Sequence, residues 1–385
     1  MRYYIIVGEP SGDLHASNLI RGLVKADSEA SVRYWGGDLM EAACVETGIE
    51  HERVRHYKDT AVMGVWDVVT HLGKIRKNFA ACREDISANR PDVLILVDYA
   101  GFNLPMARFA KERGIRTFYY IAPKTWASKE GRVEKIRRDV DRMYTIMPFE
   151  TEYFKKWGIS VRYCGNPVMD AIESRQHKGE TLEEFSRRNN LDSRPKIALL
   201  AGSRQSELKY NLPIMLEAVE EFPEYEFVIA GAPSFSIKDY EQYIGGRRDV
   251  KVVFGETYQL VSVARCALVT SGTATLETAI LGCPQVVIYK MWGGAFSDFV
   301  AHMFIKVPWI SLVNLILGRE CVKELFQRAY SHDKMIGQMK LLTGDTEERS
   351  KMLSDYEELR EKVGGPGCSQ RAGEWMYEEL ASAGS

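Results

Sequence analysis

The stretch that decides the fold is Tyr4-Ile5-Ile6-Val7-Gly8-Glu9-Pro10-Ser11-Gly12-Asp13, in which a short apolar run leads into a glycine-opened turn. Beyond the turn, apolar side chains recur at helical spacing, with Leu14, Leu19, Ile20 and Leu23 on one side. A β-branched run, a turn and an amphipathic helix form the first half of a βαβ unit. The sequence therefore predicts that the chain opens with a buried parallel strand and a helix that covers it.

Similar apolar runs follow along the chain and alternate with helical stretches. They lie at 93–97, 117–121 and 142–146 in the first half, and at 196–200, 226–230, 251–254, 267–270 and 285–289 in the second. Their alternation with helices predicts parallel sheets covered by helices on both faces, which is an α/β fold.

A polar segment, 174–195, separates the two series of strands. We therefore expect two α/β domains with a boundary near residue 170. The N-terminal domain spans 1–170 and the C-terminal domain spans 171–350. We expect the charged helical segment 351–385 to pack back on the N-terminal domain.

The composition narrows the class of protein. The chain has 385 residues, and its 51 Lys and Arg against 53 Asp and Glu leave a formal charge of −2, which argues against a nucleic-acid partner. Seven cysteines without a C-x-x-C pair indicate buried free thiols. The start has no signal-peptide pattern, and no run of about 18 apolar residues occurs, so no spanning helix is expected.

Several cofactor motifs are missing. The first turn lacks the middle glycine of the G-x-G-x-x-G dinucleotide fingerprint, and no Walker A sequence occurs. The seven histidines show no metal-ligand spacing, so we expect no metal site. No G-x-S-x-G nucleophile elbow is present either.

Ligands of open α/β sheets bind beyond the carboxyl ends of the strands, so the turns there are where we expect chemistry. Glu9, Ser11 and Asp13 occupy the first such turn, and Ser11 or Asp13 is equally suited to capping the next helix. Asp98 follows the apolar run 93–97 and would serve as a general base if burial raises its pKa. Its structural alternative is to bond the amides of a neighbouring loop.

Other strand ends carry further candidates. Pro123 and Trp126 suit either a wall that stacks on a sugar or base, or a rigid loop. In the second half, Gly202-Ser203-Arg204 with Glu207 and Ser271-Gly272-Thr273 with Glu277 place small residues at a strand end before a helix. Amides at a helix start attract phosphate, so the pair of motifs favours nucleotide binding over plain capped helices. Ser271 is a candidate cap, and Glu277 is placed to reach ribose hydroxyls.

One apolar stretch has two interpretations. Its large side chains follow helical spacing and are Val62, Val65, Trp66, Val69 and Leu72. They form either a core face or an acyl-chain or membrane-facing stripe. The segment 296–317 is also apolar but contains charged residues, so we expect it to lie against another surface and not to span a membrane.

Taken together, these motifs resemble the lipid-A-disaccharide synthase family, an inverting glycosyltransferase of the GT-B type (glycosyltransferase family 19). The resemblance runs over nearly the whole chain. It is carried by Gly8 to Asp13, Ala61 to Gly64, Asp98 with Phe102-Asn103, Pro123 with Trp126-Ala127, Pro148-Phe149-Glu150, Gly202 to Glu207, Ser271 to Glu277, Asn314-Leu315, Gly318-Arg319-Glu320 and Val322 to Leu325. It implies two Rossmann-like parallel-sheet domains that face each other across a cleft.

The resemblance also implies a reaction. The family transfers 2,3-diacylglucosamine from UDP-2,3-diacylglucosamine to the 6-hydroxyl of 2,3-diacylglucosamine 1-phosphate. The products are UDP and a β-1,6-linked tetraacyl disaccharide 1-phosphate for lipid A, the anchor of Gram-negative lipopolysaccharide. The expected enzyme needs no metal and no cofactor. It is cytoplasmic and attached peripherally to the inner membrane, and the resemblance leaves a homodimer open.

Residue roles follow from the matched motifs. Asp98 is the implied general base, with Glu9 as a second catalytic carboxylate. The implied acceptor side is lined by Ser11, Asp13, Asn103, Pro123 and Trp126. The implied nucleotide contacts are Ser203, Arg204, Glu207, Ser271, Gly272, Thr273, Glu277, Asn314, Arg319 and Glu320. The Val62-to-Leu72 stripe corresponds to a surface for acyl chains or membrane.

The chain departs from the family pattern at Gly101, Ala122, Ser128 and Asn166, which puts contacts of the acceptor loop in doubt. Two alternatives remain open on sequence. One is a UDP-sugar 2-epimerase on the same architecture, which would not need an apolar groove. The other is a noncatalytic protein that binds lipid or nucleotide.

Overall fold

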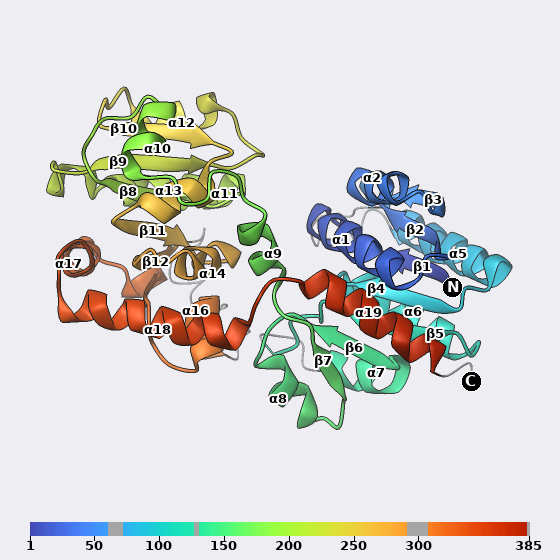
Figure 1. Cartoon of the computed structure of the whole chain (residues 1–385). Coiled ribbons are helices and arrows are strands. Elements are labelled where there is room, and N and C mark those ends of the chain that lie inside the picture. The colour runs from blue at the N-terminus through green and yellow to red at the C-terminus, as the bar shows by residue number, and fades with distance from the viewer. Residues whose placement is uncertain (61–71, 127–130, 291–306, 383–385) are drawn as a thin grey trace. The chain divides into compact units, whose positions relative to one another are not determined.

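The computed structural model describes residues 1–60, 72–126, 131–290 and 307–382 (Figure 1). The chain forms two compact units, Met1–Pro167 with Gly365–Ser385, and Val168–Gly364. The predicted stripe from Val62 to Trp66 and Val69 lies outside the described residues, as does the Leu72 side chain.

The first unit is built on a seven-stranded parallel sheet in the order β3-β2-β1-β4-β5-β6-β7. Its strands are β1 (Arg2–Ile6), β2 (Ser31–Gly36), β3 (Glu50–His56), β4 (Val93–Val97), β5 (Arg116–Tyr120), β6 (Arg142–Thr145) and β7 (Val161–Tyr163). Its helices are α1 (Pro10–Ala26), α2 (Asp38–Thr47), α3 (Tyr57–Thr60), α5 (Leu72–Asn89), α6 (Ala100–Lys111), α7 (Arg132–Asp139), α8 (Glu150–Lys155) and α19 (Cys368–Ala381).

Helices cover both faces of this sheet because successive strand residues point to opposite sides. Tyr3 and Ile5 face one core, which also contains residues of α1 and α19. Tyr4 and Ile6 face a second core, which contains residues of α5 and α6. This two-sided burial explains the continuous apolar runs in the sequence.

Helix α19 belongs to the first unit although it lies at the far end of the chain (Figure 1). It meets α1 at two glycines: a Cβ on Gly373 would lie 2.4 Å from the backbone carbon of Gly22. The Cys368 thiol donates to the Gly165 carbonyl at 3.1 Å, and Arg142 pairs with Glu379 at 2.8 Å. These contacts tie α19 to α1 and to the β6–β7 edge.

The second unit has a six-stranded parallel sheet in the order β10-β9-β8-β11-β12-β13. Its strands are β8 (Lys196–Leu200), β9 (Glu226–Gly231), β10 (Val250–Phe254), β11 (Cys266–Thr270), β12 (Gln285–Tyr289) and β13 (Lys323–Phe326). Its helices are α9 (Pro167–Glu173), α10 (Leu182–Arg188), α11 (Gln205–Leu216), α12 (Ile237–Ile244), α13 (Thr257–Val263), α14 (Thr273–Ile280), α16 (Leu312–Leu317), α17 (His332–Thr343) and α18 (Glu347–Val363).

The structure divides the segment 351–385, which we expected to pack as a whole on the N-terminal domain. Helix α18 belongs to the second unit, and only the chain from Gly365 onward belongs to the first. The reason is the buried side of α18: Tyr356 and Leu359 are fully buried there, and the Tyr356 hydroxyl accepts a hydrogen bond from Gln285 of β12 at 3.2 Å.

Two further predictions can be compared with the structure. The seven cysteines are free, and all but Cys321 are buried, as predicted. Among the described residues, no helix is long and apolar enough to cross a membrane.

Candidate active site

Two turns meet at the carboxyl ends of the central strands in the first unit. Strands β1 and β4 pair directly, with Ile6 beside Leu96, so the turns that follow them are neighbours. The Tyr99 ring packs against Gly8, where a Cβ would lie 2.2 Å from the ring. Only glycine allows this approach. Gly8 therefore brings the turn of Glu9 next to the turn of Asp98.

The backbone at Asp98 is held in an uncommon conformation. Asp98 and Tyr99 have φ angles of 43° and 45°, in the left-handed region. The Asn103 amide donates to the carbonyls of Val97 at 3.1 Å and Asp98 at 2.8 Å, and the Tyr119 hydroxyl also donates to the Asp98 carbonyl. These bonds fix the turn and so aim the Asp98 side chain.

The Asp98 carboxyl has the electrostatics of a general base. Burial raises its pKa, the negative charge of Glu9 raises it further, and the positive charge of Lys124 opposes both. A carboxylate with a raised pKa accepts a proton more readily than an exposed one. The structure thus brings together the two predicted catalytic carboxylates and adds Lys124 to them.

Two of the predicted acceptor contacts, Asp13 and Asn103, form hydrogen bonds with the backbone of their own unit. The Asp13 carboxylate is buried and accepts hydrogen bonds from the amides of Gly37 at 2.7 Å and Leu39 at 3.1 Å. It caps the start of α2, where a negative charge is favoured. Asn103 is fully buried and holds the Asp98 turn. Ser11, by contrast, is exposed in the first turn of α1.

The loop after β5 is anchored by a carboxyl that the sequence-based site prediction omitted. The Trp126 indole donates to Glu150 at 3.1 Å, and the Met147 amide donates to the other Glu150 oxygen at 3.1 Å. Pro123 is buried, and Phe149 packs edge-on against Trp126 with ring centroids 5.0 Å apart. Burial raises the pKa of Glu150 to about 7. Its signal in the sequence was the strand end at Pro148-Phe149-Glu150.

In the second unit, the start of α14 is open to solvent. Gly272 and Thr273 are exposed, and within the described part of the chain no side-chain hydrogen bond from the N-cap residue caps the helix. Ser271 was the candidate cap, but its hydroxyl donates to the Ile310 carbonyl at 3.0 Å. The first amides of α14 are therefore available, and such amides bind anions.

Glu277 lies further along α14 and is held by a tyrosine. The Tyr258 hydroxyl donates to Glu277 at 2.8 Å, and burial raises the pKa of the Glu277 carboxyl. Sequence reasoning did not identify Tyr258. Its only signal was a position just beyond the carboxyl end of β10, at the edge of the sheet where α14 also begins.

The start of α11 differs from that of α14. Glu207 accepts hydrogen bonds from the amides of Ser203 at 2.9 Å and Arg204 at 3.2 Å. The two amides that we expected to attract phosphate are thus already bonded to a carboxylate. The Arg204 side chain remains 77% exposed while one of its nitrogens pairs with Glu207 at 3.1 Å. The Arg204 guanidinium therefore remains available to a ligand at this helix start.

Three predicted nucleotide contacts have other partners. Asn314 is fully buried, donates to Val322 and Glu324, and accepts from the amides of Cys321 and Val322. The hydrogen-bonding capacity of its side chain is used within the chain, and its role as a nucleotide contact stays a prediction.

The other two predicted nucleotide contacts, Arg319 and Glu320, come directly after α16. Arg319 pairs with Asp355 at 2.7 Å and with Glu358 at 2.5 Å, both on α18. Glu320 pairs with Lys323 at 3.2 Å. The Arg319 guanidinium therefore holds the end of α16 against α18. The start of α16 is held differently, because the Ser271 hydroxyl donates to the Ile310 carbonyl just before it.

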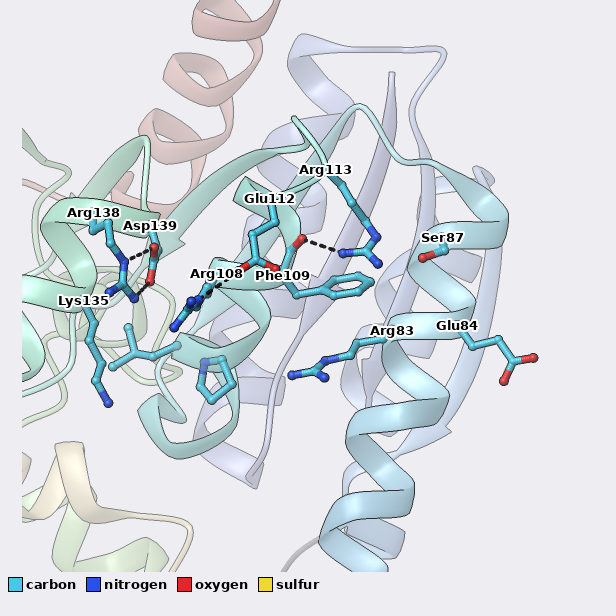
Figure 2. A pocket seen from close by; sticks show the side chains of 12 residues that line it. Arg83, Glu84, Ser87, Arg108, Phe109, Glu112, Arg113, Lys135, Arg138 and Asp139 are labelled. Carbon is cyan, nitrogen blue, oxygen red and sulfur yellow. Dashed lines mark hydrogen bonds and ion pairs between the residues drawn. The ribbon is translucent and has the colours of Figure 1, made fainter.

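A pocket of about 750 Å³ in the first unit contains none of the predicted site residues (Figure 2). It is lined by side chains on and just after α5, α6 and α7. Its basic side chains include Arg83, Arg113 and Lys135. The pocket also contains Arg108 and Arg138, which lie in the last turns of α6 and α7, where basic residues are favoured. The helix C-termini point to the edge of the sheet opposite Asp98.

Comparison with known proteins identifies the family. The family model described as lipid-A-disaccharide synthetase matches residues 3–375. The chain belongs to this family. The lipid-A-disaccharide synthase of Syntrophus aciditrophicus is 35% identical over 376 residues, covering 96% of this chain and 95% of the relative. That of Geobacter metallireducens is 34% identical over 385 residues, covering 98% and 97%. Lipid-A-disaccharide synthases are glycosyltransferases of lipid A and lipopolysaccharide biosynthesis, as predicted.

Solved structures support the fold. A UDP-GlcNAc 2-epimerase from Neisseria meningitidis bound to UDP-GlcNAc has a TM-score of 0.66 at 13% identity and covers 99% of this chain and 100% of that one. The glycotransferase of kitacinnamycin has a TM-score of 0.62 at 16% identity, covering 98% and 99%. These likenesses show the fold alone. They confirm the prediction of a GT-B fold with two Rossmann-like parallel-sheet domains.

Proposed function

We propose that this lipid-A-disaccharide synthase uses Asp98 as its general base and the second unit as its nucleotide-binding half. The donor is UDP-2,3-diacylglucosamine and the acceptor is 2,3-diacylglucosamine 1-phosphate. The observation that carries the proposal is the fixed Asp98 turn, where burial and Glu9 raise the pKa of a carboxyl at a strand end.

The nucleotide half offers both a phosphate site and a sugar contact. The open amides of α14 and the exposed Arg204 guanidinium would hold the diphosphate. Glu277, held by Tyr258, would accept hydrogen bonds from the ribose hydroxyls. Ser203 and Thr273 would add hydroxyl donors. Among the described residues, no group of three His, Cys, Asp or Glu side chains could hold a metal ion.

The chemical step is a single displacement. Asp98 removes the proton from the acceptor 6-hydroxyl as its oxygen bonds to the anomeric carbon of the donor. The bond between that carbon and the diphosphate breaks on the opposite face, so the anomeric centre inverts. The negative charge that develops on the leaving UDP is stabilised by Arg204 and the α14 amides. In this mechanism neither the proton transfer to Asp98 nor the stabilisation of the leaving UDP requires a cation from solution.

The acceptor half would consist of Glu9 and Asp98, with Ser11 exposed two residues after Glu9, and of the loop with Pro123 and Trp126 that follows the neighbouring strand β5. The expected stripe from Val62 to Leu72 would take acyl chains or contact the cytoplasmic surface of the inner membrane. A homodimer is compatible with this proposal.

A turnover assay tests the proposal. The full chain is mixed with both lipids in mild detergent and chelator, and UDP and disaccharide are measured by mass spectrometry. Disaccharide formed only with both lipids, with the β-linkage seen by NMR, is the expected result. UDP released without disaccharide would refute the assigned acceptor. Complete loss of turnover in chelator, restored by a divalent cation, would refute the metal-independent mechanism.

A further inference from the structure

Lys124 lies on a loop whose backbone is fixed on both sides. The loop leaves β5 at Ile121, which has a left-handed φ of 62° and whose amide donates to the Tyr144 carbonyl at 3.0 Å. The Thr125 amide closes a tight turn on the Pro123 carbonyl at 2.6 Å. The loop is held again where Trp126 bonds Glu150. The Lys124 side chain itself is exposed.

The surroundings of Lys124 are negatively charged. The strand that carries this loop, β5, pairs with β4, so the loop and the Asp98 turn leave adjacent strands. The positive charge of Lys124 lowers the pKa of both Asp98 and Glu150, against the effect of burial on each. The charge of Glu9 acts in the opposite direction and raises the pKa of Asp98.

The Lys124 ammonium donates no hydrogen bond to the Asp98 or Glu150 carboxyl, and its effect on both is that of a nearby charge. Lys124 is thus a cation that acts on two carboxyls without a direct contact to either. A side chain of this kind can bind an incoming anion at little cost, because no hydrogen bond to either carboxyl has to break.

We propose that Lys124 binds the phosphate of the acceptor and makes the enzyme select a phosphorylated acceptor over its dephosphorylated form. This inference rests on the proposed function. An acceptor that brings its hydroxyl to Asp98 also brings a dianionic phosphate toward Glu9 and Asp98. These carboxyls repel the phosphate, and Lys124 supplies an opposing point charge at the same strand ends.

The argument distinguishes two roles for the lysine. If Lys124 contacts the phosphate, its loss weakens only the phosphorylated acceptor. If it acts only by keeping Asp98 ionised, its loss impairs every acceptor equally and moves the acidic limb of the pH profile upward. The contrast between acceptors is therefore the decisive measurement.

The test uses the full-length chain with two acceptors, diacylglucosamine 1-phosphate and diacylglucosamine. We expect Lys124→Met to lower kcat/KM for the phosphorylated acceptor by about 10-fold to 100-fold, the range for a lost charge-assisted hydrogen bond. We expect kcat/KM for the dephosphorylated acceptor to change by less than about threefold, and Lys124→Arg to restore much of the preference.

The matched control is Lys135→Met, which changes an exposed lysine of α7 that lines the pocket in Figure 2. It should leave both acceptors unaffected. An equal loss on both acceptors, no loss on either, or a wild-type enzyme that does not prefer the phosphorylated acceptor would overturn the inference. A wild-type enzyme that forms no disaccharide from either acceptor would instead refute the proposed function.

Discussion

Replacement of Asp98 by asparagine should remove the proton acceptor without disturbing the turn that carries it. Asn is among the few residues that adopt left-handed backbone readily, so the φ of 43° at position 98 remains accessible. A positioned general base contributes about 10²-fold to 10⁴-fold. At 1.36 kcal/mol per tenfold, this corresponds to about 3–5 kcal/mol of transition-state stabilisation. We expect kcat for disaccharide formation to fall by that factor.

A comparison with Asp98→Ala separates chemistry from folding. Alanine has no side chain to support left-handed backbone, which costs roughly 1–2 kcal/mol. Asp98→Ala should therefore lose as much activity as Asp98→Asn but melt about 2–8 °C lower, given about 2–4 °C per kcal/mol in a unit of this size.

The assays are disaccharide formation by mass spectrometry, thermal unfolding by circular dichroism, and UDP binding by calorimetry. UDP affinity should be unchanged in both variants because the proposed nucleotide contacts lie in the other unit. If Asp98→Asn keeps more than about a tenth of the wild-type kcat, Asp98 is not the base.

Three further outcomes are expected. Glu9→Gln removes a charge that raises the pKa of Asp98, so the acidic limb of kcat/KM should move to lower pH; an upward shift would contradict this. Glu226→Ala removes the buried carboxylate that pairs with the fully buried Lys196 at 2.8 Å, so that Lys196 keeps only the more exposed Asp192 at 3.4 Å and two carbonyl oxygens. This change should cost about 3 kcal/mol in urea unfolding, whereas Glu173→Ala at an exposed pair should cost less than about 1 kcal/mol. Gly373→Val should release α19 and speed its proteolysis, whereas Gly365→Ala, where a Cβ meets nothing within 4 Å, should not; equal protection of both would count against the close helix crossing.

The strands that sequence reasoning found are those buried on both faces. The runs at 93–97 and 196–200 coincide with β4 and β8 because central parallel strands are continuously apolar. Strand β3, with the sequence Glu-His-Glu-Arg-Val-Arg-His, was missed because it lies at the edge of its sheet and is largely polar. Its identity depends on pairing with β2, which no local pattern reveals.

For the site, position along the chain predicted more than residue type did. Asp98 and Glu9 follow central strands, and the rule for parallel sheets placed them together. Asp13 satisfies the same rule, yet its carboxylate caps a helix whose amides lie 24 and more residues away. The Asn314 side chain of α16 likewise forms its hydrogen bonds with the following segment, at Cys321, Val322 and Glu324. A polar side chain near a strand end can contact a ligand or cap a neighbouring helix. Which of these it does depends on the groups that the fold brings next to it, and these groups are distant in the sequence.

The return of α19 to the first unit fixes the order in which the chain can mature during synthesis. Helix α1 leaves the ribosome early, but its partner helix begins at Cys368, after the whole second unit has been made. At about 5–20 residues per second, the interval is roughly 20–70 s. Throughout this time the α1 surface around Gly22 is uncovered, so the unit that starts first is completed last. A nascent chain halted anywhere before Cys368 would present that bare surface to chaperones.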